Sequence, residues 1–425
     1  MKKVLIISYY WPPSGGAGVQ RWLKMAKYLP DYGVKPFVLT VDESFASYPL
    51  IDRSFLDEVS DETEVYRTKS FEPLRIYGKI FGKKKVPYSG FTNVKTDNLL
   101  SKMSRWVRGN MFIPDARKGW NKFALPKARE IVAREDIETI ITTGPPHSTH
   151  FIGLALKKSN QSLHWIADFR DPWTDIYYYD NLLPSKNSRK KDAEMERLVL
   201  ESSDRVLAVC PSNQRLFAGK LNKENGEKVK LLTNGFDNDD FKGIKRSVSN
   251  DRLELVYTGT LAEIYDVKPI FIILQELDTP WHLTVAGNVA PEICELIREL
   301  KIDQHMTFLG HVAHKESLQL LKKCHALLHI LPNTSQAILG TTGKLFEYIG
   351  SGTPILNFGP TEGDSASFIK MAGAGESFER SDREGVLQFL RFCFENRDFS
   401  NSATNQFSRK NITGKLVDLL QEFEQ

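Results

Sequence analysis

The sequence predicts an α/β protein built from two doubly wound, Rossmann-like domains, each with a parallel sheet. Short runs of β-branched and other apolar residues alternate with segments of helical period, which is typical of βαβ units. The alternation starts at residue 4, stops in a polar stretch at 243–252 and then begins again. A chain of 425 residues is long enough for two domains that each bury a core.

The first half contains five predicted strands with helices between them. Their apolar residues run continuously rather than alternating, which indicates strands covered on both faces. The strands are expected at 4–8, 35–41, 138–143, 163–167 and 205–209, and the helices at 19–32, 120–134, 148–158 and 188–203.

The second half repeats this order of elements. Strands are expected at 253–258, 281–286, 306–309, 326–330 and 354–357, and helices at 267–277, 291–300, 314–323 and 343–350. We therefore divide the chain into domains at 1–240 and 241–405, followed by a helix at 406–425 that either caps the second domain or crosses back to the first. Open parallel sheets bind ligands beyond the carboxyl ends of their strands, so a cleft between the two domains is the expected site.

A glycine-rich loop, SGGAG at 14–18, follows the first strand. Glycine allows a backbone to come close to a phosphate, and a helix N-terminus favours an anion. A dinucleotide fingerprint is one interpretation, because Gly16 and Gly18 match it and Asp42 ends the second strand. Arg21 replaces its third glycine, however, and two prolines widen the turn. We favour a loop that faces a phosphate held mainly by the second domain.

The second half supplies candidate anchors for that phosphate. Lys344 and Glu347 lie three residues apart, on one face of the helix that follows Gly343. A lysine at a helix N-terminus suits a diphosphate, and a carboxylate one turn later suits ribose hydroxyls. Upstream strands close on glycine, including Gly259, which leaves a smooth floor for a nucleotide. Alone, the Lys/Glu pair would be an ordinary exposed helix pair.

These motifs resemble, in the same order and over nearly the whole chain, the GT-B fold glycosyltransferases of the large retaining family 4. The matching segments are SGGAGVQRWLKMAKYL (14–29), LTNGFDNDDF (232–241), YTGTL (257–261), FLGHV (308–312) and GKLFEYIGSGTPIL (343–356). The resemblance implies an acceptor-binding first domain and a nucleotide-sugar-binding second domain that face a central cleft.

The resemblance also implies roles for individual residues. Glu347 would hold the ribose, Lys344 and Lys268 the diphosphate, and the backbone at His311 and Val312 the base. Gly15, Gly16 and Gly18 would then meet the distal phosphate and the sugar. Two positions depart from the family pattern: Leu339 stands where a second glutamate is common, and Thr260 where an arginine is expected.

Polar residues beyond two strands of the first half are candidate catalytic groups. His147 starts a helix in TTGPPHSTH, as the active-site histidine of the resembled family does, and His150 follows one turn later. A helix N-terminus favours neutral imidazole, which can hydrogen-bond a sugar hydroxyl. In DFRDPWTD, Asp168, Arg170 and Asp171 either bind acceptor hydroxyls or accept a proton, or they form a structural ion pair that braces the turn.

The sequence suggests no metal site and no cofactor. The acidic residues near Arg170 lack histidine partners, and the four cysteines lie far apart without a C-x-x-C pair. The apolar start leads into Trp11-Pro12-Pro13 without a small-residue cleavage site, which favours a buried strand over a signal peptide. No apolar run approaches the roughly 20 residues needed to span a bilayer, so we expect a cytoplasmic protein.

Positive charge is concentrated in one stretch. Residues 67–134 contain 17 lysines and arginines against four acidic residues, whereas the whole chain has a net charge of +4. Aromatic residues lie among the basic ones: Tyr77 and Phe81 precede Lys83–Lys85, and Trp106 lies further along the stretch. A solvated insertion packed on the first domain and a peripheral contact with an anionic membrane both fit, and no nucleic-acid module is recognisable.

Together these features predict a metal-independent glycosyltransferase. It would move a sugar from a nucleotide diphosphate to a glycan or lipid-linked acceptor, with retention, in surface polysaccharide or lipopolysaccharide synthesis at the inner face of the cytoplasmic membrane. A sugar-nucleotide epimerase of the same fold, and a nucleotide-sugar- or polyanion-binding protein without turnover, are the alternatives. The sequence does not identify the base, the sugar, the acceptor, the linkage or the oligomeric state.

Overall fold

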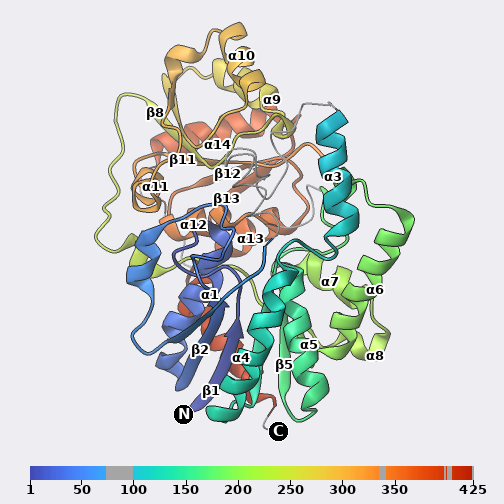
Figure 1. Ribbon diagram of the computed structural model, residues 1–425. Coiled ribbons are helices and arrows are strands. Elements are labelled where there is room, and N and C mark those ends of the chain that lie inside the picture. The colour runs from blue at the N-terminus through green and yellow to red at the C-terminus, as the bar shows by residue number, and fades with distance from the viewer. Residues whose placement is uncertain (73–98, 335–340, 397–398, 400–403, 424–425) are drawn as a thin grey trace. The chain divides into compact units, whose positions relative to one another are not determined.

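The computed structural model describes the chain except residues 73–98, 335–340, 397–398, 400–403 and 424–425 (Figure 1). The chain divides into two compact units, one formed by Met1–Thr233 with Thr413–Gln425 and the other by Asn234–Ile412. Each unit contains one parallel sheet with helices on both faces. This confirms the predicted fold class of two doubly wound, Rossmann-like domains.

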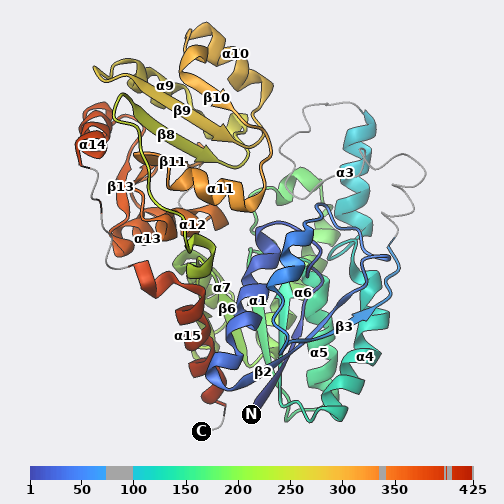
Figure 2. The same cartoon turned by 90° about the vertical axis from the view of Figure 1, so that its left-hand side faces the viewer.

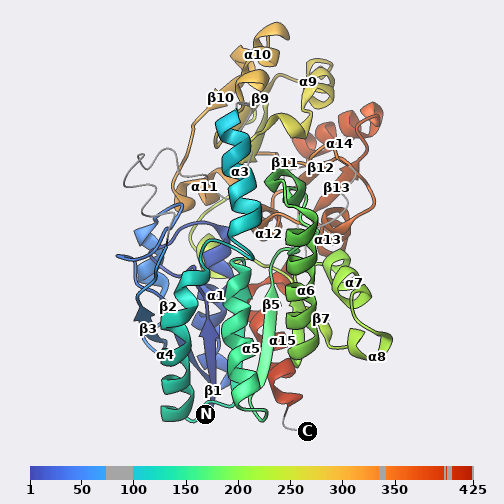
Figure 3. The same ribbon diagram turned by 45° about the vertical axis from the view of Figure 1, so that its right-hand side comes forward.

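The first unit has a seven-stranded sheet in the order β3-β2-β1-β4-β5-β6-β7. Figures 2 and 3 show α4, α5 and α6 on one face of it and α1 and α15 on the other. The strands are β1 (Lys2–Ile7), β2 (Val34–Val41), β3 (Glu64–Thr68), β4 (Thr139–Gly144), β5 (His164–Phe169), β6 (Arg205–Ala208) and β7 (Val229–Leu231). The helices are α1 (Ala17–Tyr28), α3 (Leu99–Met111), α4 (Asn121–Arg134), α5 (His150–Ser159), α6 (Lys186–Ser202), α7 (Pro211–Gly219), α8 (Lys223–Gly226) and α15 (Arg409–Gln421).

The second unit has a six-stranded sheet in the order β10-β9-β8-β11-β12-β13. Because parallel crossovers are right-handed, α9 and α10 cover one face and α11, α12 and α13 the other (Figure 2). The strands are β8 (Leu253–Thr258), β9 (Trp281–Ala286), β10 (Met306–Phe308), β11 (Ala326–Ile330), β12 (Ile355–Phe358) and β13 (Gly375–Phe378). The helices are α9 (Lys268–Gln275), α10 (Pro291–Glu299), α11 (His314–Leu321), α12 (Gly343–Ser351), α13 (Asp364–Ala372) and α14 (Arg383–Glu395).

The sequence missed the edge strands β3, β7 and β13. They are three to five residues long and rich in polar residues, and much of β3 and β13 is only half-buried. An edge strand needs less apolar sequence than a central one, so its signal is weak. The C-terminal helix α15 passes from the second unit to the first, since residues from Thr413 onward belong to the first.

A buried ion pair links α1 to β5 in the first unit. Arg21 Nη2 lies 2.9 Å from Asp168 Oδ1, and the two side chains are only 1% and 0% exposed. The other carboxylate oxygen accepts hydrogen bonds from Trp22 Nε1 at 2.7 Å and from Thr143 Oγ1 at 2.8 Å. A buried charge is stable only when it is paired and hydrogen-bonded, and Asp168 meets both conditions.

The same guanidinium holds the chain that follows β7. Arg21 Nη1 donates to the carbonyl of Thr233 at 2.8 Å, and Nη2 donates to that of Leu232 at 2.9 Å. Arg21, which occupies the third position of the glycine fingerprint, therefore connects α1, β5 and the segment at Leu232 and Thr233, where the chain leaves the first unit. Of the roles predicted for it, Asp168 has the structural one, because it forms a buried ion pair.

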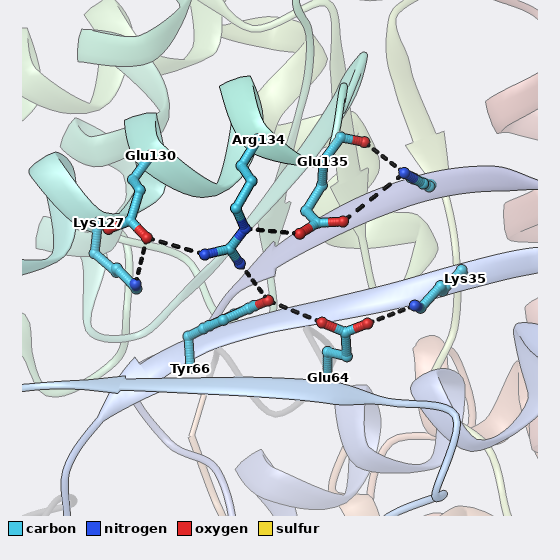
Figure 4. Close-up of polar contacts among 8 residues, drawn as sticks. Lys35, Glu64, Tyr66, Lys127, Glu130, Arg134 and Glu135 are labelled. Carbon is cyan, nitrogen blue, oxygen red and sulfur yellow. Dashed lines mark hydrogen bonds and ion pairs between the residues drawn. The ribbon is translucent and has the colours of Figure 1, made fainter.

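A network of ion pairs lies near the amino ends of β1, β2 and β3, opposite the strand ends where ligands bind. In Figure 4, Arg134 at the end of α4 contacts Glu130 at 3.0 Å, Glu135 at 2.8 Å and the hydroxyl of Tyr66 at 2.6 Å. Tyr66 in turn donates to Glu64, which also pairs with Lys35. Exposed pairs of this kind contribute little stability individually.

Removing the carboxylate of the buried pair should therefore cost much more than removing an exposed one. We expect Asp168→Ala to lower the free energy of unfolding by about 3–5 kcal/mol, because the Arg21 charge stays buried without its partner. Urea denaturation measures the loss. Glu201→Ala, which breaks the exposed Arg197–Glu201 pair, is the control and should cost less than about 1 kcal/mol. Equal effects of the two substitutions would contradict this account.

Candidate functional site

In the second unit, Lys344 reaches the carboxyl end of β8. Gly343 is the first residue of α12, and Lys344 follows it. The Lys344 ammonium donates to the Thr258 carbonyl at 3.2 Å and lies 3.8 Å from the centre of the Tyr257 ring. Burial lowers the pKa of this amine to about 7. The group is thus a partly desolvated cation at a helix N-terminus, where an anion is favoured.

Glu347 lies one turn further along α12 and contacts the start of α11. Its Oε1 is 3.0 Å from Nε2 of His314. His314 is the first residue of α11, and the turn that precedes it carries His311 and Val312. The structure therefore brings the turn assigned to the base next to the carboxylate assigned to the ribose. The sequence prediction missed His314, which is 33 positions away from Glu347.

The strand ends beside Lys344 are packed closely through glycines. Gly259 has a φ of 102°, and a side chain at Gly287 would lie 2.0 Å from the Gly259 carbonyl oxygen. The ends of β8 and β9 can approach each other because Gly287 has no side chain. Thr260, which replaces the expected arginine, is exposed, and Lys268 is an exposed residue at the start of α9.

The start of α12 is also connected to β11 and β12. His329 Nε2 lies 3.2 Å from the hydroxyl of Thr342, and its Nδ1 lies 2.7 Å from Asn357 Oδ1. Burial, followed by the charge of Lys344, lowers the pKa of His329 to about 3, so this ring is neutral. Thr341 Oγ1 is buried without a hydrogen-bond partner among the described residues. Leu339 lies outside the described residues.

In the first unit, the glycine loop leads into the N-terminus of α1. The N–H of Gly15 is taken by the Leu50 carbonyl at 2.9 Å. Gly16 precedes α1 with a φ of 94°, and the helix has no side-chain cap. The N–H groups of the first helical turn, rather than that of Gly15, are therefore suited to an anion.

Gly18 makes room for Arg170. A side chain at Gly18 would lie 2.3 Å from Arg170 Nη1, which donates to the Gly18 carbonyl at 2.6 Å. The same guanidinium donates to Gly144 at 3.3 Å and to Pro145. Arg170 therefore ties the glycine loop to the turn that carries His147.

The two candidate histidines have different surroundings. His147 lies at the end of β4 with its ring parallel to that of Trp173, at a centroid distance of 4.8 Å. Burial holds the pKa of His147 well below its ordinary value, so the ring is neutral near pH 7. His150 is fully buried, contacts Thr142 Oγ1 at 2.8 Å and stacks on Phe169. His147 is therefore the one of the two that is placed to meet a ligand.

His147 lines a cavity of about 990 Å³ whose lining residues all belong to the first unit. Aromatic rings make up much of its wall, among them Tyr10, Tyr48, Phe112, Trp173 and Tyr178. Arg67, Arg108 and Arg117 line it as well. The sequence prediction counted these arginines in its basic stretch, Arg108 and Arg117 among the residues mixed with aromatic ones, but did not assign them to a ligand site.

Asp171 and Arg170 are not among the described residues that line this cavity. Asp171 is exposed, and its charge adds to burial in raising the pKa of the Tyr178 hydroxyl, so the two groups are close. Among the residues that the structure describes, no group of three or more His, Cys, Asp or Glu side chains could hold a metal ion. The described helices include none that is long and apolar enough to cross a membrane. Tyr77, Phe81 and Lys83–Lys85 lie outside the described residues.

Comparisons with known proteins identify the fold. No family model and no curated protein matches the sequence. The structure is similar to that of HepE (Alr3699) from Anabaena in complex with UDP, with a TM-score of 0.61, 13% identity, and coverage of 99% of this chain and 100% of HepE. A glycosyltransferase from Rickettsia africae is similar with a TM-score of 0.62 and 14% sequence identity, and the match covers 100% of both chains. The lipopolysaccharide outer core galactosyltransferase WaaB is similar with a TM-score of 0.59 and 13% sequence identity, and the match covers 99% of each chain. The chain has the GT-B fold.

Proposed function

We propose that the protein is a glycosyltransferase that transfers a sugar from a nucleotide diphosphate to a glycan or lipid-linked acceptor. The observation that carries the proposal is the placement of Lys344, a desolvated amine at the N-terminus of α12, one turn before Glu347 and beside the glycine-lined end of β8. The similarity of the fold to HepE, which was solved with UDP, supports a nucleotide in this place.

The donor site follows from these contacts. Lys344 and the N-terminus of α12 would hold the diphosphate, and the exposed Lys268 would add a second charge from α9. Glu347, oriented by His314, would accept hydrogen bonds from the ribose hydroxyls. The backbone at His311 and Val312, in the turn before His314, would contact the base.

The reaction we propose proceeds with retention and without a metal ion. The bond between the anomeric carbon and the phosphate oxygen breaks, and a bond to the acceptor oxygen forms on the same face of the sugar. The departing phosphate oxygen takes the acceptor's proton. Lys344 and the helix N-terminus stabilise the negative charge on the leaving group, which is the main electrostatic task in this step.

The first unit would position the acceptor. His147 offers a neutral imidazole to a sugar hydroxyl in the cavity wall. Arg170 acts as a positioning residue, because its guanidinium fastens the glycine loop to the turn before His147. Asp171 lies near the cavity residue Tyr178 and would bind an acceptor hydroxyl.

We place the reaction in surface polysaccharide or lipopolysaccharide synthesis, as the resemblance to family 4 implies, on the cytoplasmic side of the membrane. WaaB, which shares the fold, is named for such a pathway. A sugar-nucleotide epimerase is the alternative, and one structure with this fold is named as an epimerase. Product analysis without an acceptor separates the two, because only an epimerase converts the nucleotide sugar alone.

A thermal-shift panel of UDP, GDP, ADP, CMP and NAD, with EDTA in every sample, tests the donor site. We expect one nucleoside diphosphate to raise the melting temperature, since a ligand at 100 times its dissociation constant adds about 2.7 kcal/mol to stability. Lys344→Met should weaken its binding by about 1.5–3 kcal/mol, the contribution of a charged hydrogen bond. Glu347→Gln should also weaken it.

The control for this panel is Lys370→Met, which removes an exposed lysine from α13 and should bind the nucleotide as the wild type does. A shift with NAD alone would contradict the proposal and would favour the interpretation of the glycine loop as a dinucleotide-binding fingerprint. If Lys344→Met binds the nucleotide with unchanged affinity, Lys344 does not hold the diphosphate and the proposed donor site is wrong.

The affinity for the nucleotide sugar should depend on pH through Lys344. Its amine has a pKa of about 7 in the free protein, and a bound diphosphate raises that value because it favours the charged form. Affinity is therefore constant below about pH 7 and falls about tenfold per pH unit above it, until the pKa of the bound state is reached. Calorimetric titration from about pH 6 to about pH 9 measures the fall. Lys344→Met should show a flat profile above about pH 7, and an equal slope in both proteins would refute the assignment.

We also propose that α3 contacts an anionic membrane surface. Met103, Trp106 and Met111 are 57%, 49% and 64% exposed on this helix, beside the basic residues Lys102 and Arg105. Exposed apolar and basic side chains together favour an anionic lipid interface.

Sedimentation with phosphatidylglycerol vesicles tests the membrane contact. The wild type should sediment with these vesicles and not with phosphatidylcholine vesicles, and Trp106→Ser should lose at least half of the bound protein. Met371→Ser, which removes an equally exposed apolar side chain from α13, is the control. Equal binding of the wild type and Trp106→Ser would exclude α3 as the contact.

A further inference from the structure

We propose that the cavity of the first unit selects an acceptor that carries a phosphate ester beside a sugar ring, and that Arg67, Arg108 and Arg117 bind the phosphate. This inference rests on the proposed function, since it names the acceptor class of the proposed transferase. It divides the basic stretch of the sequence into two parts. Arg108 and Arg117 are half-buried in the cavity wall and Arg67 lines the cavity with an exposed side chain, whereas Lys102 and Met103 are exposed on α3 away from the lining residues.

The three arginines reach one cavity from three different elements. Arg67 comes from β3, Arg108 from α3 and Arg117 from the turn before Trp120. Burial lowers the pKa of Arg108, and the positive charge of Arg117 lowers it further, so these two guanidinium groups repel each other. A dianion between them would replace this repulsion with attraction, and guanidinium groups bind phosphate oxygens in pairs.

Two of the arginines make hydrogen bonds to backbone carbonyls. Arg67 donates to the Pro12 carbonyl at 3.2 Å, and Arg117 donates to that of Ser47 at 3.0 Å. Among the described residues, Arg117 Nε is buried without a hydrogen-bond partner. A buried donor without a partner is costly, and a ligand oxygen in the cavity would satisfy it.

The cavity also contains carboxylates, but each has its own donors. Asp115 accepts from the backbone N–H and the hydroxyl of Ser148, both at 2.8 Å, and Asp192 accepts from Trp173 and Tyr179. Glu43 pairs with Arg53. Asp42 accepts from the backbone N–H of Ser44, and the charge of Arg67 contributes to the lowering of the Asp42 pKa. These contacts hold the acids in the wall of the cavity. The charge of Asp115 also favours the charged forms of Arg108 and Arg117, because it acts to raise the pKa of both.

The rest of the wall suits a sugar. Tyr10, Tyr48, Trp173 and Tyr178 contribute aromatic rings to the wall, and such rings pack against the apolar faces of a sugar ring. A volume of about 990 Å³ is at the upper end of the range of small-molecule pockets, about 300–1,000 Å³. It accommodates a sugar together with a phosphate.

Calorimetric titration of the full chain carrying Lys344→Met tests the proposal, because this background removes the anion-binding lysine of the second unit. The probes are glucose 1-phosphate with methyl glucoside as its neutral counterpart, and farnesyl diphosphate with farnesol as its neutral counterpart. We expect glucose 1-phosphate to bind at least tenfold more tightly than methyl glucoside. Arg67→Gln, Arg108→Gln and Arg117→Gln should each weaken that binding about tenfold, whereas Arg197→Gln, on the exposed face of α6, should not.

The two phosphorylated probes separate the sources of the phosphate. Binding of glucose 1-phosphate alone indicates a sugar phosphate, and binding of both probes indicates that a lipid-linked phosphate is recognised as well. Binding of farnesyl diphosphate alone would overturn the sugar part of the proposal. Equal affinity for charged and neutral probes, no binding of either phosphorylated probe, or wild-type binding in the arginine variants would overturn the proposal. Circular dichroism checks that each variant is folded. Failure of the proposed function is a separate result, because it is the absence of any nucleotide shift with Lys344 intact.

Discussion

The structure of the first unit depends on the buried pair of Arg21 and Asp168. The pair joins the helix after the glycine loop to the interior strand β5, and through the carbonyls of Leu232 and Thr233 it fixes the segment where the chain leaves the unit. Two buried charges are favourable only if their geometry is well determined, so the pair is better suited to specifying one arrangement than to adding stability. Arg170 makes the second connection, from β5 to the glycine loop.

The second unit presents its functional groups by a different means. Lys344 is brought to the end of β8 by the start of α12, with aromatic rings on one side and a carbonyl as its partner. Keeping an amine in a place that lowers its pKa to about 7 costs free energy in the absence of a ligand. An anion bound at Lys344, as we propose, would recover that free energy. Departures from the most stable local choice are expected at functional sites, and Lys344 is such a departure.

The sequence was sufficient for the central strands and for α12, since both are encoded by local patterns: buried β-branched runs, and a glycine followed by Lys344 and Glu347 at helical spacing. It was not sufficient for β3, β7 and β13, because short edge strands bury little apolar surface. It could not predict that His314 orients Glu347, because the two residues come from different helices and meet only when α11 packs on α12. Asp168 and Arg170 lie two positions apart, and only the tertiary contacts reveal that one is paired internally while the other donates to three carbonyls.

The basic stretch illustrates a general limit of charge counting. A count of 17 basic and four acidic residues between positions 67 and 134 indicates an electrostatic function, but it does not distinguish a surface from a cavity. That distinction is made by β3 and α3, which direct Arg67 and Arg108 to the same hollow while exposing Trp106. In a cavity, each charge is screened less by water and counts for more than on a surface. The half-buried Arg108 and Arg117 would therefore select a ligand in the cavity more strongly than the exposed lysines of the same stretch.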